Sequence, residues 1–463
     1  MNLNKNKSVG IWGYGVVGKA AITYFLNKQY TVGLMEKKNL SHEEITQLKK
    51  INVQVYTEEN RNYFFNSYDF LFSSPGINIA KYYPTYKHKW IHELDIFYQN
   101  VQKPTIAITG SVGKTSCTHI LASLLTELNI STIVGGNIGT ASLELLNNCS
   151  FDPSFVLLEV SSFQLEYCKF FAPYLAIWTN FYANHLDHHN SEQSYFLAKQ
   201  TMLIHQKNNT YSLIPLSLQL LVPQPLFGHQ RSYFTLHKPV KEQIQSLTVN
   251  ERIYSLEGNM LWRYTTTTVT PVTSINNTNT ISFIENMVII TAACDILNIN
   301  SSLIHSSQYT VELPAHRLEY IGCYNNINFY NDSKSTTMAS TLAAVTQLKN
   351  RPLHLFIGGL SKGVNRTPHI TQLKNMVHHV YCFGAEANEL YKSCLQNNIA
   401  ASYFSSLDIA VSICVKQVNP GDCVLLSPAG SSYDLYRDYE QRGNHFKTLV
   451  MKYMKKYQSQ QTT

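Results

Sequence analysis

Residues 104–120 read PTIAITGSVGKTSCTHI, and this stretch decides the fold of the middle of the chain. The apolar run Ile106–Ile108 predicts a short buried strand, which gives way to the loop Thr109–Ser116 and then to an apolar segment of helical period. A strand, a glycine loop, a lysine, a hydroxyl and a helix in this order predict a phosphate-binding loop. In such a loop Lys114 reaches the terminal phosphates and the Thr115 hydroxyl can hold Mg²⁺.

The loop differs from the eight-residue Walker pattern, because Ile108 stands where the first glycine would be. A glycine turn on the surface before a helix is the alternative interpretation. The strand before the loop and the helix after it favour phosphate binding. The expected nucleotide-binding residues of the loop are Gly110, Ser111, Val112, Gly113, Lys114, Thr115 and Ser116.

The bulk composition is that of an ordinary globular chain. Its 463 residues suggest about three domains, and 44% hydrophobic with 14% charged residues exclude a disordered protein. The net charge of +7 suits anionic ligands, but no lysine–arginine block predicts nucleic-acid binding. Nine cysteines without a CxxC pair favour reduced thiols. We find neither a signal peptide nor an apolar run of about 18 or more residues, and therefore expect a cytoplasmic protein without membrane insertion.

A second glycine loop, Gly13–Gly18, follows the predicted strand Ser8–Trp12 and precedes the predicted helix Ala20–Leu26. The next predicted strand ends at Glu36, about 20 residues after the glycines, as in a dinucleotide-binding fingerprint. A tight turn between a strand and a helix has the same pattern, so the residues alone leave both interpretations open. The repeated strands predict a small parallel α/β domain that ends near residue 100.

Two further strands of the middle part end in polar residues. Phe155–Leu158 is followed by Glu159, at the strand end where Mg²⁺ is usually held beside a phosphate loop. Leu175–Thr179 leads to a segment with three histidines and an aspartate in five residues, His185–His189. Zinc suits that composition, but no second ligand cluster follows, and Mg²⁺ with phosphate already explains these ligands. Residues 206–279 predict only hairpins at a sheet edge.

The last third of the chain again alternates strands and helices, and three predicted strands end in polar loops. These loops are Asn331–Thr337, Gly358–Gly363 and Ser427–Asp434. Ligands bind at such strand ends in open α/β sheets. A lysine between glycines at a strand end, as at Lys362, favours anion binding over an ordinary surface position.

Together these motifs resemble the Mur ligase family, the ATP-dependent amide-bond synthetases of peptidoglycan assembly. The motifs that carry the resemblance are Thr109–Ser116, Glu159, Asn184–Asp187, His316–Glu319, Asn331–Lys334 and Gly358–Gly363. The resemblance covers the chain except residues 206–280. It implies three α/β domains: a Rossmann-like UDP-sugar-binding domain at 1–102, a central P-loop ATPase-like domain at 103–313, and a Rossmann-like domain for amino acid and ATP at 314–463.

Within the family, the chain is most similar to the branch that joins D-glutamate to UDP-N-acetylmuramoyl-L-alanine. The segments that indicate this are Gly13–Gly18, Gly136–Gly139, Glu159–Glu166, Leu426–Ala429 and Tyr439–Gly443. The resemblance implies that ATP phosphorylates the substrate carboxylate and that the amine of D-glutamate attacks the acyl phosphate. The alternatives are a Mur or folylpolyglutamate-type ligase for another amino acid, and a non-catalytic paralogue that binds nucleotide sugars. Assignment of the chain as a nicotinamide dehydrogenase would be supported by the first glycine loop alone.

The resemblance also assigns roles to single residues, and we expect a monomer that uses ATP and two Mg²⁺ ions. The expected catalytic residues are Lys114, His185, Lys199 and Lys362, with Lys199 carbamylated. The expected metal ligands are Thr115, Glu159, His185 and Lys199. Besides the loop, ATP is expected to bind Asn286, Arg317, Asp332 and Lys334. The UDP-sugar is expected at Gly13, Tyr14, Gly15, Glu36, Asn137 and Ser161, so that the first loop binds a uridine nucleotide and not NAD. D-Glutamate is expected at Thr336, Lys362, Ser432, Tyr433 and Tyr439.

Three positions depart from the family pattern. Of the His-Asn-x-x-Asn box only Asn286 is present, in the segment Glu285–Ile289. Gly430 stands where a cysteine is common, and Tyr433 where a leucine is common. The adenine site and the amino-acid site are therefore expected to differ in detail from those of other members.

Overall fold

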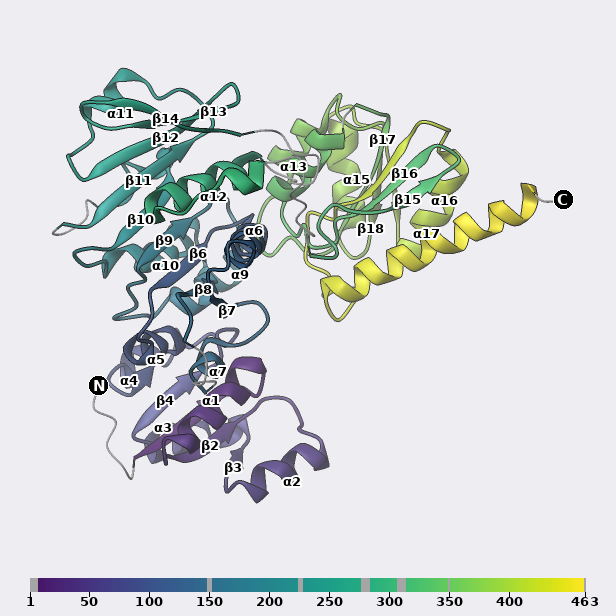
Figure 1. The fold of residues 1–463 in the computed structure, drawn as a ribbon. Helices are drawn as coiled ribbons and strands as arrows, with labels where there is room; N and C mark the ends of the chain where they lie inside the picture. Colours follow the sequence, from purple (N-terminus) through teal and green to yellow (C-terminus); the bar gives the residue numbers. More distant parts are fainter. Residues whose placement is uncertain are drawn as a thin grey trace. The chain divides into compact units, whose positions relative to one another are not determined.

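A computed structural model of the chain describes residues 7–147, 152–223, 228–275, 284–305, 314–348 and 350–461 (Figure 1). The chain divides into two compact units. Unit 1 comprises Met1–Asn180, Gln193–Asn276 and Glu285–Tyr309, and unit 2 comprises Phe181–Glu192, Asn277–Ile284 and Thr310–Thr463. The described part contains two sheets in unit 1 and one in unit 2. This architecture confirms the predicted α/β class.

The first sheet of unit 1 has five parallel strands in the order β3-β2-β1-β4-β5. Its main elements are β1 (Ser8–Trp12), α1 (Val16–Asn27), β2 (Thr31–Met35), α2 (His42–Lys50), β3 (Gln54–Tyr56), α3 (Arg61–Ser67), β4 (Phe70–Ser73), α4 (Tyr83–Tyr86), β5 (Trp90–Ile91) and α5 (Glu93–Asn100). The central strands are apolar throughout, because helices cover both faces of a parallel sheet. Val9, Ile11 and Leu34 are accordingly fully buried.

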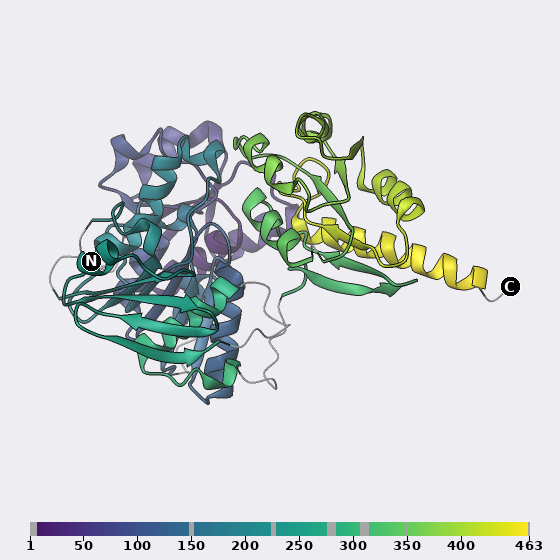
Figure 2. The ribbon, with the colours of Figure 1, turned by 90° about the horizontal axis from the view of Figure 1, so that it is seen from above.

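The second sheet of unit 1 has nine strands in the order β14-β13-β12-β11-β10-β9-β6-β8-β7. Figure 2 shows its teal strands side by side. Its strands are β6 (Thr105–Thr109), β7 (Thr132–Gly136), β8 (Phe155–Glu159), β9 (Leu175–Trp178), β10 (Tyr211–Pro215), β11 (Gln230–Thr235), β12 (Glu251–Glu257), β13 (Met260–Tyr264) and β14 (Val269–Ser274). Its helices are α6 (Lys114–Glu127), α7 (Ser142–Asn147), α8 (Ser162–Leu165), α10 (Glu192–Ile204), α11 (Lys241–Gln245) and α12 (Ile284–Leu297).

The hairpins expected over residues 206–279 are only partly present. β12, β13 and β14 pair antiparallel, as predicted, whereas β10 and β11 extend the parallel sheet. Side chains on both faces of these two strands are buried, as in any parallel sheet, so they lack the alternation of an edge hairpin. Residues 276–279 of that prediction lie outside the described residues.

Two buried carboxylates of α5 join the two sheets of unit 1. Glu93 accepts hydrogen bonds from the backbone N–H and hydroxyl of Ser142, and from the side-chain amide of Gln164. Asp95 accepts three backbone N–H groups, those of Lys169, Phe170 and Phe171. Every one of these donors belongs to the nine-stranded part. The carboxylates therefore fix the five-stranded sheet to the nine-stranded one.

Unit 2 contains a six-stranded sheet in the order β15-β16-β20-β17-β18-β19, parallel except for the β15–β16 pair. Its strands are β15 (Glu319–Tyr324), β16 (Ile327–Asn331), β17 (Leu353–Gly358), β18 (His379–Phe383), β19 (Ala401–Phe404) and β20 (Cys423–Leu426). Its helices are α9 (Leu186–His189), α13 (Met338–Leu348), α14 (Thr367–Ile370), α15 (Ala387–Gln396), α16 (Leu407–Gln417) and α17 (Tyr439–Gln461).

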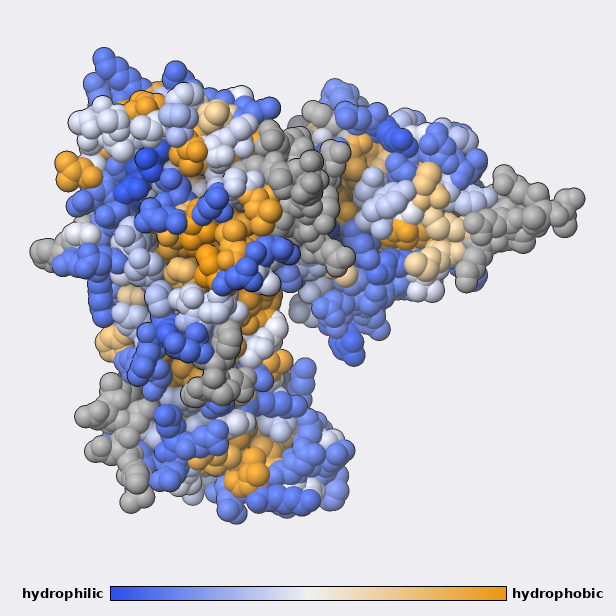
Figure 3. Space-filling model, viewed as in Figure 1, coloured by the Kyte–Doolittle hydropathy of each residue, from blue (hydrophilic) through white to orange (hydrophobic). Residues whose placement is uncertain are grey.

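Most of the surface shown in Figure 3 is hydrophilic, with smaller apolar patches between the polar groups. Among the helices of the described ranges, none combines the length and the apolar character needed to cross a membrane.

Candidate functional site

The predicted phosphate loop lies between β6 and α6, where Gly110 and Gly113 have positive φ angles of 148° and 86°. The end of neighbouring strand β9 holds this loop. The backbone N–H of Val112 donates to Oδ1 of Asn180 at 2.9 Å, and the Thr179 hydroxyl donates to the Val112 carbonyl at 2.6 Å. Thr179 and Asn180 were not among the predicted site residues, although their place at the end of a strand was a signal.

Two lysines converge on one carbonyl oxygen of the loop. Nζ of Lys114 lies 2.8 Å from the Gly110 oxygen, and Nζ of Lys199 lies 2.9 Å from the same atom. Lys199, on α10, is only 1% exposed and its Nζ lies 4.7 Å from the centre of the Tyr195 ring. Burial and the charge of Lys114 hold the pKa of Lys199 well below its usual value, against the opposite effect of Glu159. Both effects shift the protonation equilibrium of Lys199 towards the neutral amine.

Oxygen ligands suited to Mg²⁺ surround this loop. Glu159 ends β8 and is 2% exposed, and Thr115 is the second residue of α6 and is 3% exposed. Oε1 of Glu159 accepts a hydrogen bond of 2.8 Å from the side-chain amide of Asn137, which follows β7. A carboxylate and a hydroxyl are hard ligands, so the donor set fits Mg²⁺. The pairing of Asn137 with Glu159 could not be seen in the sequence.

Asn286, one of the residues expected to bind ATP, lies at the phosphate loop. Its Oδ1 accepts a hydrogen bond from the Cys117 thiol at 3.3 Å, and a Cβ added at Gly113 would lie 2.8 Å from the same oxygen. The Nδ2 of Asn286 is buried and has no hydrogen-bond partner among the described residues. A buried donor without a hydrogen-bond partner costs about 1–3 kcal/mol of folding free energy. An acceptor on a bound ligand would remove this cost, so the amide can serve as a ligand contact.

The first glycine loop and Glu36 come together at the carboxyl ends of β1 and β2. Gly13 has a φ angle of 100°, and a Cβ at Gly18 would overlap the Gly13 carbonyl oxygen. Oε2 of Glu36 accepts the backbone N–H of Tyr14 at 2.6 Å. Four of the predicted UDP-sugar residues, Gly13, Tyr14, Gly15 and Glu36, therefore form one loop structure. The hydroxyl of Ser161, a fifth, caps α8 in a reciprocal pair with Gln164.

In unit 2, the segment that contains Arg317 forms a strained turn. His316 and Leu318 have positive φ angles of 67° and 45°. Such backbone costs of order 1–3 kcal/mol per residue and is common at functional sites. The turn is fixed by Asp332, which accepts the Leu318 N–H at 3.1 Å and the Ser427 hydroxyl at 2.8 Å. Burial raises the pKa of Asp332 to about 6.

The predicted nucleotide lysine and the predicted D-glutamate aromatic are neighbours. Nζ of Lys334 lies 5.0 Å from the centre of the Tyr439 ring. The ring centres of His316 and Tyr439 are 6.1 Å apart. Tyr439 therefore borders the residues predicted for ATP.

Two loops of unit 2 bring most of the predicted D-glutamate residues together. Lys362 has a φ angle of 55°, and its Nζ lies 3.4 Å from the hydroxyl of Thr336. The Ser432 loop is joined to this loop by two backbone hydrogen bonds between Leu360 and Ser431, of 3.0 and 2.9 Å. Ser432 itself is 3% exposed, whereas the fifth predicted residue, Tyr433, is 73% exposed.

A cavity of about 220 Å³ in unit 2 lies beside these loops. Its lining includes Asn184, Thr336, Ser361, Arg366 and His369. Asn184 directly precedes the predicted metal ligand His185, whose backbone N–H donates to the Asn184 side-chain oxygen at 3.0 Å. Glu192 also lines this cavity, so its polar lining carries groups of both charges.

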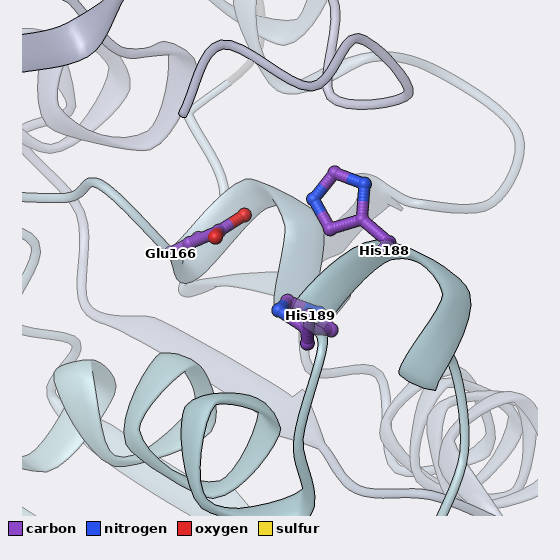
Figure 4. A group of neighbouring side chains, drawn as sticks. All are labelled: Glu166, His188 and His189. Atoms are coloured by element: carbon purple, nitrogen blue, oxygen red, sulfur yellow. The ribbon is translucent and has the colours of Figure 1, made fainter. Parts of the chain in front are cut away.

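Two of the histidines that suggested zinc are adjacent on α9 (Figure 4). The ring centres of His188 and His189 are 4.8 Å apart. Glu166, the third residue drawn, directly follows α8 in unit 1. Structural zinc sites use four protein ligands, so this histidine pair does not by itself make one.

The fold and these residues define an α/β protein with a nucleotide phosphate loop. Residues 108–221 match the family model of the Mur ligase middle domain, and residues 316–430 match that of the Mur ligase, glutamate ligase domain. Among solved structures, the MurF ligase from Thermotoga maritima in complex with ADP aligns with a TM-score of 0.57 and 13% identity, covering 97% of this chain and 96% of that one. MurC from the same organism aligns with a TM-score of 0.56 and 15% identity, over 98% and 100%. These two likenesses show a shared fold.

Curated relatives are more similar in sequence. The UDP-N-acetylmuramoylalanine–D-glutamate ligase of Prochlorococcus marinus (strain NATL2A) is 31% identical over 372 residues, which are 76% of this chain and 74% of that protein. The enzyme of the same name from Buchnera aphidicola subsp. Baizongia pistaciae is 30% identical and covers 96% of this chain and 98% of its own. The chain therefore belongs to the Mur ligase family.

Proposed function

We propose that this chain is an ATP-dependent ligase that adds D-glutamate to UDP-N-acetylmuramoyl-L-alanine in peptidoglycan precursor synthesis. The observation that carries the proposal is the phosphate loop, on which Lys114 and the buried Lys199 converge at the Gly110 oxygen. The names of the curated relatives supply the substrate pair. The two glycine loops, Gly13–Gly18 and Thr109–Ser116, would bind two nucleotides. The loop Gly358–Gly363, called the lysine loop below, would bind a carboxylate. Three such sites suit an enzyme with three anionic substrates.

The reaction has two chemical steps. The terminal phosphoryl group of ATP passes to the carboxylate of the alanyl group, which gives ADP and an acyl phosphate. The amine of D-glutamate then attacks the acyl carbon, and phosphate leaves as the amide bond forms and the amine loses a proton. Both steps build negative charge on oxygen. Lys114 and the loop N–H groups stabilise that charge, since groups fixed in advance need little reorganisation.

The residues of the phosphate loop also fit Mg²⁺, which would neutralise phosphate charge when bound. Thr115 and Glu159 would hold it in unit 1, together with a carbamate on Lys199. A carbamate forms when a neutral amine attacks CO₂ and releases a proton. Burial and the lowered pKa of Lys199 favour that neutral amine. The carbamate would place a negative charge beside the Lys114 ammonium group, which attracts it. From unit 2 we assign His185 as the ligand of a second ion.

The remaining nucleotide contacts are assigned from the family resemblance. We assign Asn286 in unit 1 to the adenosine moiety of ATP, because its amide is buried beside the loop with an open donor. In unit 2 we assign Asp332 to the ribose, and Arg317 and Lys334 to phosphate. The first glycine loop with Glu36, and Asn137 and Ser161, would bind the UDP-sugar.

Lys362, Thr336 and Ser432 would bind the carboxylates of D-glutamate, with Tyr433 and Tyr439 at the border of their site. Domain boundaries at residues 102 and 313, a monomeric state and a cytoplasmic location complete the proposal. None of the cysteines in the described ranges forms a disulfide.

The experiment that tests the function is phosphate release with ATP, Mg²⁺ and UDP-N-acetylmuramoyl-L-alanine, with the amino acid varied. Release that depends on D-glutamate, and not on L-glutamate, L-lysine or glycine, supports the proposal. Release with a different amino acid would assign the chain to another ligase of the fold. Binding of the UDP-sugar without release under any condition would make it a non-catalytic paralogue.

A further inference from the structure

Arg366 joins the two loops to which we assign D-glutamate. Its guanidinium is buried, with the residue only 6% exposed. Nη2 donates to the carbonyl oxygen of Gly359 at 3.2 Å, and Nη1 lies 3.4 Å from the carbonyl oxygens of both Gly358 and Ala429. Gly358 and Gly359 are the first two residues of the lysine loop, and Ala429 belongs to the loop after β20. One side chain therefore bridges the ends of two strands.

Glu386 holds the guanidinium from its other side. Nη2 of Arg366 also donates to Oε2 of Glu386, which is the residue before α15. The second carboxylate oxygen, Oε1, accepts the backbone N–H of Ser361 at 2.9 Å. The ion pair thus contacts the lysine loop through Ser361 as well as through the glycine carbonyls. Removal of Glu386 would leave the buried guanidinium of Arg366 charged and without its carboxylate partner.

The space that the guanidinium occupies depends on Gly430. A Cβ added at Gly430 would lie 2.8 Å from Nη1 of Arg366 and would overlap the Gly358 carbonyl oxygen. Gly430 therefore leaves the room that Arg366 fills. A larger residue at this position would displace the guanidinium or push the two loops apart.

The lysine loop needs such support because its backbone is strained. Lys362 has a φ angle of 55°, which a residue with a side chain adopts at a cost. Strained backbone persists only where its surroundings fix it. The contacts of Arg366 and Glu386 fix the residues that precede Lys362, and Arg366 itself lines the cavity beside Thr336.

We propose that Arg366, held by Glu386, is a positioning residue for the amino-acid carboxylate site. It sets Lys362 and Ser432 at the separation that the carboxylates of D-glutamate require. This role rests on the proposed function, because it takes these two residues as the D-glutamate contacts. In this role Arg366 contacts neither ATP nor the UDP-sugar.

The test is steady-state kinetics of the full-length chain with each substrate varied in turn. Arg366→Met is expected to raise KM for D-glutamate about 10- to 100-fold, because a misplacement near 1 Å has effects of that size. KM for ATP and for UDP-N-acetylmuramoyl-L-alanine should change by less than about twofold. Arg366→Lys keeps the charge but loses the planar fork, so its KM should lie between those of wild type and Arg366→Met. Arg351→Met, at an exposed arginine of the same unit, is the matched control.

Two further variants keep the test decisive if Arg366→Met does not fold. Glu386→Gln removes the charge and keeps the shape, and Gly430→Ala pushes on the guanidinium from the other loop. Each should raise KM for D-glutamate selectively. An unchanged KM for D-glutamate in folded variants, or an equal rise for all three substrates, would overturn the role of Arg366. Wild-type chain without D-glutamate-dependent turnover would instead overturn the proposed function, and this role with it.

Discussion

The side-chain nitrogen of Lys199 lies 2.9 Å from the carbonyl oxygen of Gly110, inside the turn of the phosphate loop. A fully buried ammonium group at this point would face the positive charge of Lys114, which reaches the same oxygen at 2.8 Å. Burial and that charge both lower the pKa of Lys199. The arrangement therefore favours an uncharged amine, the form that reacts with CO₂.

Replacement of Lys199 by alanine tests the carbamate. Lys199→Ala should be nearly inactive, and acetate should restore part of its activity, because a short carboxylate can fill the space and carry the charge of the carbamate. The measurement is ADP release with and without acetate. Chloride at equal ionic strength is the control for a salt effect. No recovery in the folded variant, together with an unmodified Lys199 in the intact protein, would argue against carbamylation.

Replacement of Lys114 tests the phosphate loop. Lys114→Ala should lower kcat for ADP release at least about 100-fold, the usual effect of removing one group that stabilises transition-state charge. Lys241→Ala, at an exposed lysine on α11 of the same unit, should keep wild-type turnover. Near-normal turnover of Lys114→Ala would mean that phosphate is bound elsewhere.

The first glycine loop can be tested at Gly18. A Cβ at Gly18 would overlap the Gly13 carbonyl oxygen, so Gly18→Ala should open the turn and raise KM for the UDP-sugar about tenfold or more. Gly76→Ala is the matched control, because a Cβ there meets no atom within 4 Å. Circular dichroism first checks that both variants fold, and KM for the UDP-sugar is then measured for each of them. Equal KM values for the two variants would show that this loop does not bind that substrate.

The buried imidazole of His92 gives a prediction about acid stability. Its ring stacks on that of Tyr167, and burial with the nearby charge of Lys169 lowers its pKa to about 3. In the unfolded chain an ordinary histidine takes up a proton near pH 6.5, whereas the folded chain keeps His92 neutral. The free energy of unfolding should therefore fall as the pH drops below about 6.5, by about 2 kcal/mol at pH 5.

Denaturant unfolding at pH 7.5 and pH 5 measures this effect. His92→Gln should remove the part of the pH dependence that comes from the buried imidazole. His88→Gln, at an exposed histidine, should leave that dependence as in wild type. If His92→Gln lost as much stability at pH 5 as wild type does, the assignment of the pH dependence to His92 would be wrong.

The sequence predicted those parts of the fold that depend on neighbouring residues. The strand, loop and helix around Lys114 are present as expected. The spacing of apolar residues and the glycines of a turn are signals that lie within the segment itself. The strands that precede Glu159 and Ser427 are also present, at nearly the predicted bounds. Asn286 lies at the loop even though the rest of its motif is missing.

The local sequence pattern does not indicate which distant segments contact one another. Arg366 and Glu386 are 20 residues apart, and nothing in the local pattern marks either as part of one ion pair. The bond between Asn137 and Glu159 depends on the side-by-side placement of β7 and β8, which sequence period does not reveal. Residues 206–279 were predicted least well, since a polar, threonine-rich composition hides the two parallel strands within it.

The most direct test of the central claim is the mass of the product. The chain is incubated with ATP, Mg²⁺, UDP-N-acetylmuramoyl-L-alanine and D-glutamate, and the UDP-sugar is analysed by mass spectrometry. A ligase that adds D-glutamate should form a UDP-sugar heavier by one glutamyl residue, in equal amount with ADP and phosphate, and no such product with L-glutamate. ADP release without a change in the mass of the UDP-sugar, or addition of a different amino acid in preference, would contradict the proposed function.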